Sequence, residues 1–312
     1  MIDFSAFIAL FPHLVAGPVL RYHLLAEQFH HRVHSWSNFS RGCTIFMVGF
    51  CKKVLITDTV APLADAAFAI KNPSMMDAWL GTIAYTIQLF FDFSGYTDMA
   101  IGLALMIGFV FPQNFNDPYT SKSITEFLQR WHMSLSSWLR EYLYIPLGGN
   151  KKGTRRTYIN LFLTMLLGGL WHGANWTFVV WGAWHGGILA IERYLKSKFG
   201  DSILPSWLRI IKTMLLVMIG WIFFRAIDLN NALQMLRGLI GLNGFNFSNM
   251  MEWQIEPDRL GILFVAIFLV YAMPWLHRYR GGPMRYLLIP LFFWAVATLS
   301  AQNFTPFLYF QF

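Results

Sequence analysis

Charged residues are scarce in this 312-residue chain: Asp, Glu, Lys and Arg together make up 13% of it, against about 25% in an ordinary soluble domain. So few charges cannot cover the surface of a soluble globule of this size. Hydrophobic residues make up 56% of the sequence and the mean hydropathy is +0.45, which indicates a membrane protein. The alternative, a set of buried core helices in a large soluble protein, is disfavoured by the same hydropathy.

Cysteine is almost absent. The two cysteines, Cys43 and Cys51, lie in or near an apolar segment, so they predict neither a disulfide framework nor a metal site. The chain also lacks a linker, a composition shift or a tandem repeat, so we expect a single domain over residues 1–312. Its apolar start, residues 4–20, lacks a basic n-region and a small-residue cleavage site, and is therefore not a signal peptide.

Long apolar stretches are what the chain does have. They cover residues 78–91, 159–171, 174–191, 215–224, 260–276 and 286–299. As a helix, the third of them would reach roughly 27 Å, close to the thickness of the hydrocarbon layer. The shorter stretch 99–111 follows Asp92, Gly95 and Asp98, and predicts a re-entrant or strongly tilted element after a break in the helix. We therefore expect an all-α, polytopic helical membrane protein.

Basic residues gather between these stretches. They are Lys52 and Lys53; Lys151, Lys152, Arg155 and Arg156; Arg193, Lys196, Lys198, Arg209 and Lys212; and Arg278, Arg280 and Arg285. If these clusters are cytoplasmic, the later spans alternate without conflict, and both the connection 228–258 and the tail 302–312 lie outside. The pattern does not assign sides to residues 1–111. The net charge of +8 then reflects topology and attraction to anionic headgroups rather than nucleic-acid binding.

A helix is predicted to begin at Ser123, because Ser123 and Glu126 have the spacing of a capping box. Apolar residues from Ile124 to Tyr142 recur at helical spacing, which predicts an amphipathic helix suited to the membrane interface or to a groove in the protein. His132 falls near its apolar side. A lone histidine in that position is usually a hydrogen-bonded core residue, and catalysis is the alternative interpretation.

The loop that follows, residues 147–153, is rich in glycine and carries Lys151 and Lys152. Backbone N–H groups and ammonium groups in such a loop can bind phosphates. A cytoplasmic turn that carries topogenic charge is an equally good interpretation.

His172 lies where two apolar stretches meet, between Trp171 and Gly173. Ionisable residues inside a membrane are costly, so they are candidates for function by default. Burial would keep the imidazole neutral, which is the state that a general base requires. The alternative is an interhelical hydrogen bond that joins the hairpin. For His185, inside the next stretch, and for Asp92 and Asp98, we favour structural roles.

Several long motifs occur in a fixed order along the chain. They are FPHLVAGP at 11–18, FDFSGYTDMA at 91–100, NFN at 114–116, SITEF at 123–127, RWHMSLS at 130–136, WHGAN at 171–175 and PFLYF at 306–310. Together they resemble the membrane-bound O-acyltransferase (MBOAT) family, and within it the membrane subunits of bacterial alginate O-acetylation systems. Glu141 stands where relatives often have Asp, and Val110 where they often have a basic residue.

The resemblance implies re-entrant and interfacial amphipathic helices around a central funnel, in a multi-pass protein of the bacterial inner membrane. The family's invariant histidine corresponds to His172 and its second functional histidine to His132. By this likeness, His172 removes the proton of an acceptor hydroxyl as the hydroxyl attacks an acetyl thioester, and His132 orients the acceptor or the thioester. Candidate substrate-binding residues are Asn114, Asn116, Asn175, Trp171, Lys151 and Lys152.

The same resemblance implies acetyl-CoA as the donor, no bound cofactor or metal, and an exopolysaccharide such as alginate as the final acceptor. Periplasmic acetyltransferase subunits are the implied partners. Family members usually have further spans before the 11–18 motif, so we expect this chain to lack those N-terminal spans. Two alternatives of other classes remain: a transporter whose histidines line a substrate path, and a non-catalytic membrane scaffold for a polysaccharide-acetylation system.

Thiol release separates acyl transfer from the two alternatives. We expect the purified protein to release the free thiol of CoA from acetyl-CoA, because acyl transfer breaks the thioester C–S bond. A transporter or a scaffold would leave the thioester intact. The measurement is the rate of thiol appearance, with and without the N-terminal spans, against a protein-free control.

Overall fold

The computed structural model describes residues 2–14, 17–276, 284–301 and 307. The part of the chain so described is helical and contains no strand. In chain order the α-helices are α1 (Ile2–Ile8), α2 (Tyr22–His30), α3 (Trp36–Cys51), α4 (Asp58–Ala69), α5 (Met75–Met106), α6 (Ile124–Arg130), α7 (Met133–Leu139), α8 (Thr154–His172), α9 (Trp176–Phe199), α10 (Ser206–Arg225), α11 (Leu229–Leu239), α12 (Asn249–Glu252), α13 (Pro257–Leu276) and α14 (Met284–Ala301). The predicted all-α class is confirmed.

Short 3₁₀ and π segments join several of these helices. The 3₁₀ turns are η1 (Phe11–His13) and η3 (Pro118–Thr120), and the π segments are η2 (Lys52–Thr57) and η4 (Arg140–Tyr144). Two predicted features, the basic residues Arg278 and Arg280 and most of the 306–310 motif, lie outside the described residues. The predicted tail 302–312 also lies outside them, apart from Phe307.

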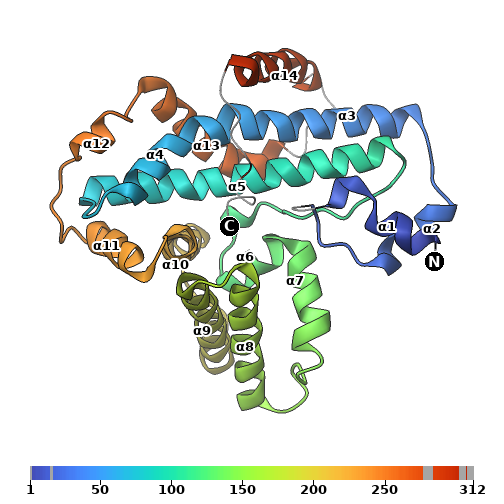
Figure 1. The fold of residues 1–312 in the computed structure, drawn as a ribbon. Coiled ribbons are helices and arrows are strands. Elements are labelled where there is room, and N and C mark those ends of the chain that lie inside the picture. Colours follow the sequence, from blue (N-terminus) through green and yellow to red (C-terminus); the bar gives the residue numbers. More distant parts are fainter. Residues whose placement is uncertain (1, 15–16, 277–283, 302–306, 308–312) are drawn as a thin grey trace.

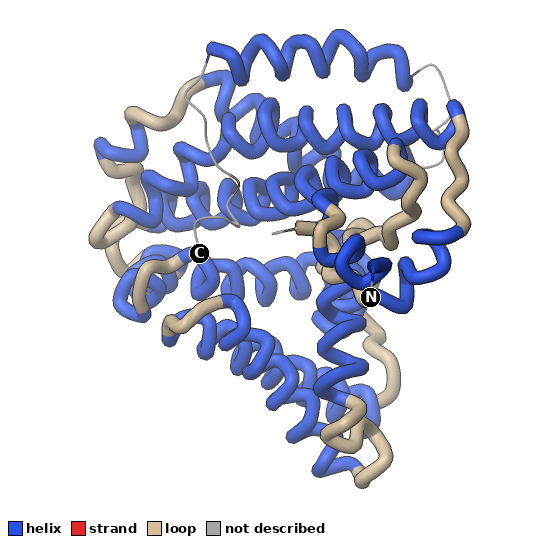
Figure 2. Tube along the Cα trace, turned by 45° about the vertical axis from the view of Figure 1, so that its right-hand side comes forward, coloured by secondary structure: helices blue, strands red, loops and turns tan. Residues whose placement is uncertain are grey.

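Two groups of helices meet at α5 (Figures 1 and 2). On one side α5 packs against α3 and α4, with α14 against α3. On the other side lies a group formed by α6 to α10, in which α8 and α9 form an antiparallel pair (Figure 1). The candidate site lies in this second group.

By length and composition, two of the described helices could cross a membrane: α10 and the segment Pro257–Trp275 of α13. The predicted stretches 78–91 and 159–171 lie within α5 and α8, and 286–299 lies within α14. The stretch 174–191 begins two residues before α9, and 99–111 extends beyond the end of α5 at Met106. Large apolar side chains are exposed on the outer helices, for example Phe264 at 68% and Phe268 at 70% on α13. Such a surface suits contact with lipid acyl chains better than contact with water.

The predicted break near Asp92 and Asp98 is wrong: α5 runs without interruption through both residues for 32 residues. The physical reason is that their charges are paired with lysines of another segment. Lys53 Nζ lies 3.0 Å from Asp92 Oδ1 and 2.8 Å from Asp58 Oδ1, and all three side chains are at most 8% exposed. Their structural role is as expected, but they join helices rather than break one.

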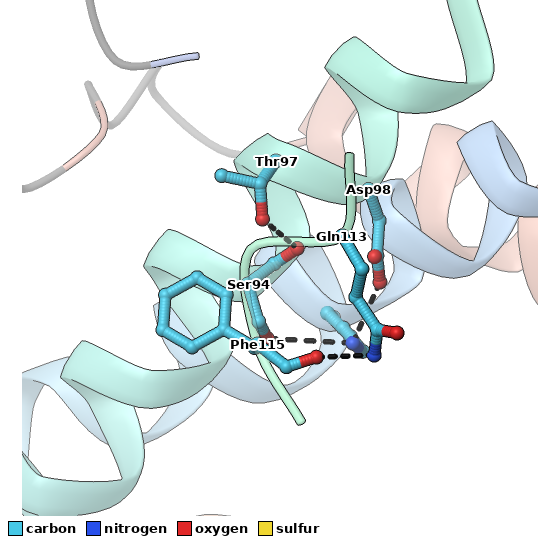
Figure 3. A network of polar contacts seen from close by, with 6 residues as sticks. Ser94, Thr97, Asp98, Gln113 and Phe115 are labelled. Carbon is cyan, nitrogen blue, oxygen red and sulfur yellow. Dashed lines mark hydrogen bonds and ion pairs between the residues drawn. The ribbon is translucent and has the colours of Figure 1, made fainter. Parts of the chain in front are cut away.

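A second ion pair lies six residues further along α5. Lys52 Nζ donates to Asp98 Oδ2 at 2.7 Å and to Ser94 Oγ at 3.3 Å (Figure 3). Lys52 and Lys53 both lie in the π segment η2, which continues the helix from α3 into α4. The wider π turn changes the direction of successive side chains, so the two lysines reach Asp98 and Asp92 at different heights on α5. The two pairs therefore fix the register of α3 and η2 against α5.

Close backbone contact holds α8 against α9. A Cβ atom on Gly169 would lie 2.3 Å from the Phe178 carbonyl oxygen, and one on Gly182 would lie 2.5 Å from the Met165 carbonyl oxygen. Only glycine fits at both positions. This contact places the end of α8, with His172, beside the first turns of α9.

The first structural prediction concerns the buried Lys53. Lys53→Met removes the cation that Asp58 and Asp92 share, so we expect the free energy of unfolding in mixed micelles to fall by about 3–5 kcal/mol. The exposed Lys71 provides the control, since Lys71→Met should change the same free energy by less than about 0.5 kcal/mol. Equal effects of the two variants would contradict a stabilising role for the buried pair.

Candidate functional site

A cavity of about 340 Å³ lies among α5, α6, α7, α8, α9 and α10. Its walls are mostly apolar, and both His132 and His172 line it. The two predicted catalytic histidines, which are 40 positions apart in the sequence, therefore share one cavity. Pockets of this kind, apolar with a few convergent polar groups, are typical of small-molecule sites.

His172 is the last residue of α8 and is partly exposed. Aromatic rings surround its imidazole: the ring centroids of Phe224 and Trp181 lie 5.0 and 5.3 Å away in edge-on contacts, and Trp171 packs at 5.1 Å. Within the described ranges no protein group hydrogen-bonds to the ring. The alternative interpretation, an interhelical hydrogen bond from His172, therefore has no partner in that part of the chain.

His132 lies at a break that the sequence did not predict. The helix from Ser123 ends at Arg130, and His132 has the left-handed backbone conformation, with φ +45°, before α7 begins. The predicted N-cap is confirmed, since Ser123 Oγ accepts from Glu126 N at 3.0 Å. The continuous amphipathic helix to residue 142 is wrong, because the left-handed residue divides it.

The segment around Asn114 holds this break in place. Asn114 O accepts from Met133 N at 2.9 Å, and Arg130 O accepts from Asn116 N at 3.0 Å. On its other side the His132 ring meets the Phe93 ring edge-on, with centroids 4.7 Å apart. The imidazole is thus fixed between a loop and α5, with its ring at the cavity.

One end of the cavity is polar and basic. Arg140, Tyr144, Asn150 and Arg193 line it, and the Tyr144 hydroxyl donates to Asn150 Oδ1. Burial raises the pKa of the Tyr144 phenol, so its O–H stays available as that donor. Arg193 lies close enough to Tyr144 to interact with it electrostatically. These four residues had no part in the predicted site. Arg193 belonged to a basic cluster interpreted as topogenic, and Arg140 belonged to the polar side of the predicted amphipathic helix.

Glu192, next to Arg193, ties α9 to the start of α6. Its carboxylate accepts from the backbone N–H groups of Ile124 and Thr125 at 2.9 and 3.0 Å. A carboxylate at a helix N-terminus satisfies free N–H groups and complements the helix dipole. The capping motif in the sequence gave no sign of this second cap, which comes from a distant helix.

The predicted substrate-binding residues fall at different places. Lys151 and Lys152 are exposed in the turn before α8 and do not line the cavity. Asn116 is exposed, and Trp171 is 50% exposed beside His172. Asn175 caps α9: its Oδ1 accepts from Thr177 N at 3.1 Å and its Nδ2 donates to Ile227 O at 2.9 Å.

Asn114 is 1% exposed and does not line the cavity. Its side chain contacts His132 at the ring nitrogen Nδ1. His185 is fully buried, and its Nδ1 donates to the Trp181 carbonyl oxygen at 3.0 Å. Among the residues that the structure describes, no group of three or more His, Cys, Asp or Glu side chains gathers as metal ligands would.

Known proteins resemble this chain along its whole length. The sequence pattern of the MBOAT, membrane-bound O-acyltransferase family, matches residues 1–236. A protein of Azotobacter vinelandii named probable alginate O-acetylase AlgI is 48% identical, with 100% of this chain and 70% of the relative covered. A protein of the same name from Pseudomonas putida is 50% identical, covering 100% and 69%. A peptidoglycan O-acetyltransferase of Helicobacter pylori is 39% identical over 88% of this chain and 53% of its own length.

Filling the cavity tests whether it is the site. Gly168 lines it, and a Cβ there would meet only the end of the Leu139 side chain, at 3.3 Å. We expect Gly168→Leu to fold but to lower acyl transfer at least about tenfold, since a barrier of about 1.4 kcal/mol suffices. Gly187→Leu on α9, with open space around its Cβ, is the control. Transfer at the control's rate in Gly168→Leu would exclude this cavity as the site.

Proposed function

The chain belongs to the membrane-bound O-acyltransferase family, and from this premise we propose that it moves an acetyl group from a cytoplasmic thioester across the membrane toward an exopolysaccharide. As a member it is an acyltransferase. One observation supports the proposed site most: His132 and His172 line the same mostly apolar cavity, which has a basic end.

In the proposed reaction His172 is the general base. The acceptor hydroxyl oxygen attacks the thioester carbonyl carbon, and His172 takes the hydroxyl proton. The C–S bond then breaks, the thiolate leaves, and the proton on His172 is available to neutralise it. The aromatic rings around His172 limit its contact with water, which favours transfer over hydrolysis of the thioester.

The donor is proposed to be acetyl-CoA, entering at the basic end. Arg140 and Arg193 can pair with phosphate oxygens there, while the apolar walls accept the uncharged arm of a thioester. Lys151 and Lys152 add positive charge in the nearby turn without lining the cavity. We propose that this end of α8 and α9 lies in the cytoplasm, in accord with the positive-inside rule.

The acceptor side is proposed to be the opposite end of α8. Trp171 and Asn175 flank His172 there, with Asn175 tied to the start of the connection between α10 and α11 through Ile227 O. The names of the relatives point to a polysaccharide acceptor, and we propose alginate or a similar exopolymer, reached through periplasmic acetyltransferase subunits. The protein would then be multi-pass in the bacterial inner membrane.

Short helices support the proposed funnel of re-entrant and interfacial elements. Each of α6 and α7 has 7 residues, which is about 10 Å of helix and far too short to span a bilayer. Both helices line the cavity. Non-spanning segments at membrane depth are stable only where protein or a polar cavity satisfies their backbone groups.

Substitution of His172 tests the proposal. In the intact protein, expressed in a strain scored for acetylated polymer, we expect His172→Gln to lower acetylation by about 10²–10⁴-fold, because it removes the base. His23→Gln, at an exposed position that does not line the cavity, is the matched control. Normal acetylation at normal protein levels in His172→Gln would end the catalytic assignment and favour a scaffold or a transporter.

A further inference from the structure

The Asn114 side chain points to His132, which has the left-handed backbone, and to Ser134 in the first turn of α7. Its Oδ1 lies 3.1 Å from His132 Nδ1, 3.1 Å from Ser134 N and 2.8 Å from Ser134 Oγ. Asn114 itself is 1% exposed, in the segment between α5 and η3. One carbonyl oxygen therefore faces three groups that can donate.

The backbone of Ser134 fixes which way the amide of Asn114 lies. A backbone N–H can only donate, so the atom 3.1 Å from Ser134 N must be an acceptor. In the flipped amide an NH₂ group would face that N–H. The hydrogen-bond network therefore identifies this atom as the amide oxygen of Asn114.

The Ser134 hydroxyl also has hydrogen-bond partners other than His132. Ser134 Oγ accepts from Val19 N at 2.9 Å and has one hydrogen, which goes to Asn114 Oδ1 at 2.8 Å. The longer approach of Ser134 Oγ to His132 Nδ1, at 3.4 Å, cannot use the same hydrogen. Nδ1 of His132 therefore receives no hydrogen from Ser134.

The tautomer of His132 follows. Its Nδ1 faces an acceptor oxygen, so the neutral ring carries its hydrogen on Nδ1 and its lone pair on Nε2. Nε2 is the nitrogen that stays available to a substrate, since the ring lines the cavity. In this form His132 can accept a hydrogen bond or a proton, and cannot donate to a carbonyl oxygen.

We propose that Asn114 is a positioning residue that sets the Nδ1–H tautomer of His132 and holds its left-handed backbone. The proposal rests on the proposed function, in which His132 contacts a substrate, and it narrows that role. His132 Nε2 receives a hydrogen bond from a second hydroxyl of the acceptor, because the single hydrogen of the attacking hydroxyl goes to His172. It does not stabilise the oxyanion of the thioester. The same amide that was a candidate substrate ligand from sequence thereby acts through the histidine.

Nitrogen NMR of the intact protein labelled with ¹⁵N-histidine tests the tautomer without any activity. The His132 signals are assigned by their loss in His132→Asn. We expect a protonated Nδ1 and an unprotonated Nε2 in the wild type, the same pattern in Asn114→Asp, and loss of the Nδ1–H preference in Asn114→Leu. A wild-type ring protonated on Nε2, or an unchanged pattern in Asn114→Leu, would overturn the proposal. If Asn114→Leu does not fold, the wild-type and Asn114→Asp spectra still decide.

Kinetics then separate positioning from general structural damage. We expect Asn114→Leu to lower kcat on the order of 10–100-fold with little change in KM, as when the hydrogen-bonded supports of functional histidines are removed. Asn114→Asp should restore most of the rate, and Asn230→Leu, at an exposed position of α11, should match the wild type. In a His132→Asn background Asn114→Leu should have no further effect, and an additive loss would overturn the proposal.

These results are distinguishable from failure of the proposed function. If His172→Gln remains active, the catalytic assignment fails while the ¹⁵N pattern of His132 still reports on Asn114. If His172→Gln is inactive and the ¹⁵N pattern does not depend on Asn114, the positioning proposal fails alone.

Discussion

The pairing of buried charges along α5 is the constraint on which the rest of the structure depends. Lys53, Asp58 and Asp92 are too buried to be hydrated, so each charge is stable only beside its partners. The pairing sets how α3, η2 and α4 lie against α5. Phe93, the residue after Asp92, packs against His132, so the same register that satisfies the charges also places one wall of the cavity.

The two histidines reach the cavity by different means. His172 arrives at the end of a helix that glycine contacts hold close to α9, and aromatic rings surround it. His132 arrives through a backbone conformation that few residues adopt, held by hydrogen bonds from a separate loop. The first arrangement gives a partly exposed imidazole among apolar rings, and the second gives a buried imidazole with a fixed orientation. Acyl transfer between two substrates benefits from both.

The helical class and the N-cap at Ser123 could be predicted from the sequence. So could the choice of His132 and His172 as candidates, and the structure brings both to one cavity. The sequence was insufficient wherever a distant segment decides the outcome. The helix was expected to break at Asp92 and Asp98 because lysines on another segment are invisible to local pattern. The break at His132 was missed because local propensity favours a continued helix, while Asn114 supplies the compensating bonds. Arg193 was overlooked because a charge near the membrane surface has the same pattern whether it faces solvent or a cavity.

The left-handed backbone at His132 also limits which sequences can occupy this position. Most side chains with a β-carbon are strained there, whereas glycine fits without strain, and asparagine, aspartate and histidine are tolerated better than other residues. A residue at this position must therefore first tolerate the left-handed backbone, and only among such residues can the chemistry of the side chain be selected. An alanine there would change backbone and function at once, so a loss of activity would not identify its cause. Replacement of this imidazole by the short side chain of asparagine or aspartate has little structural cost. Such a replacement would put a different polar group at the cavity without changing the backbone.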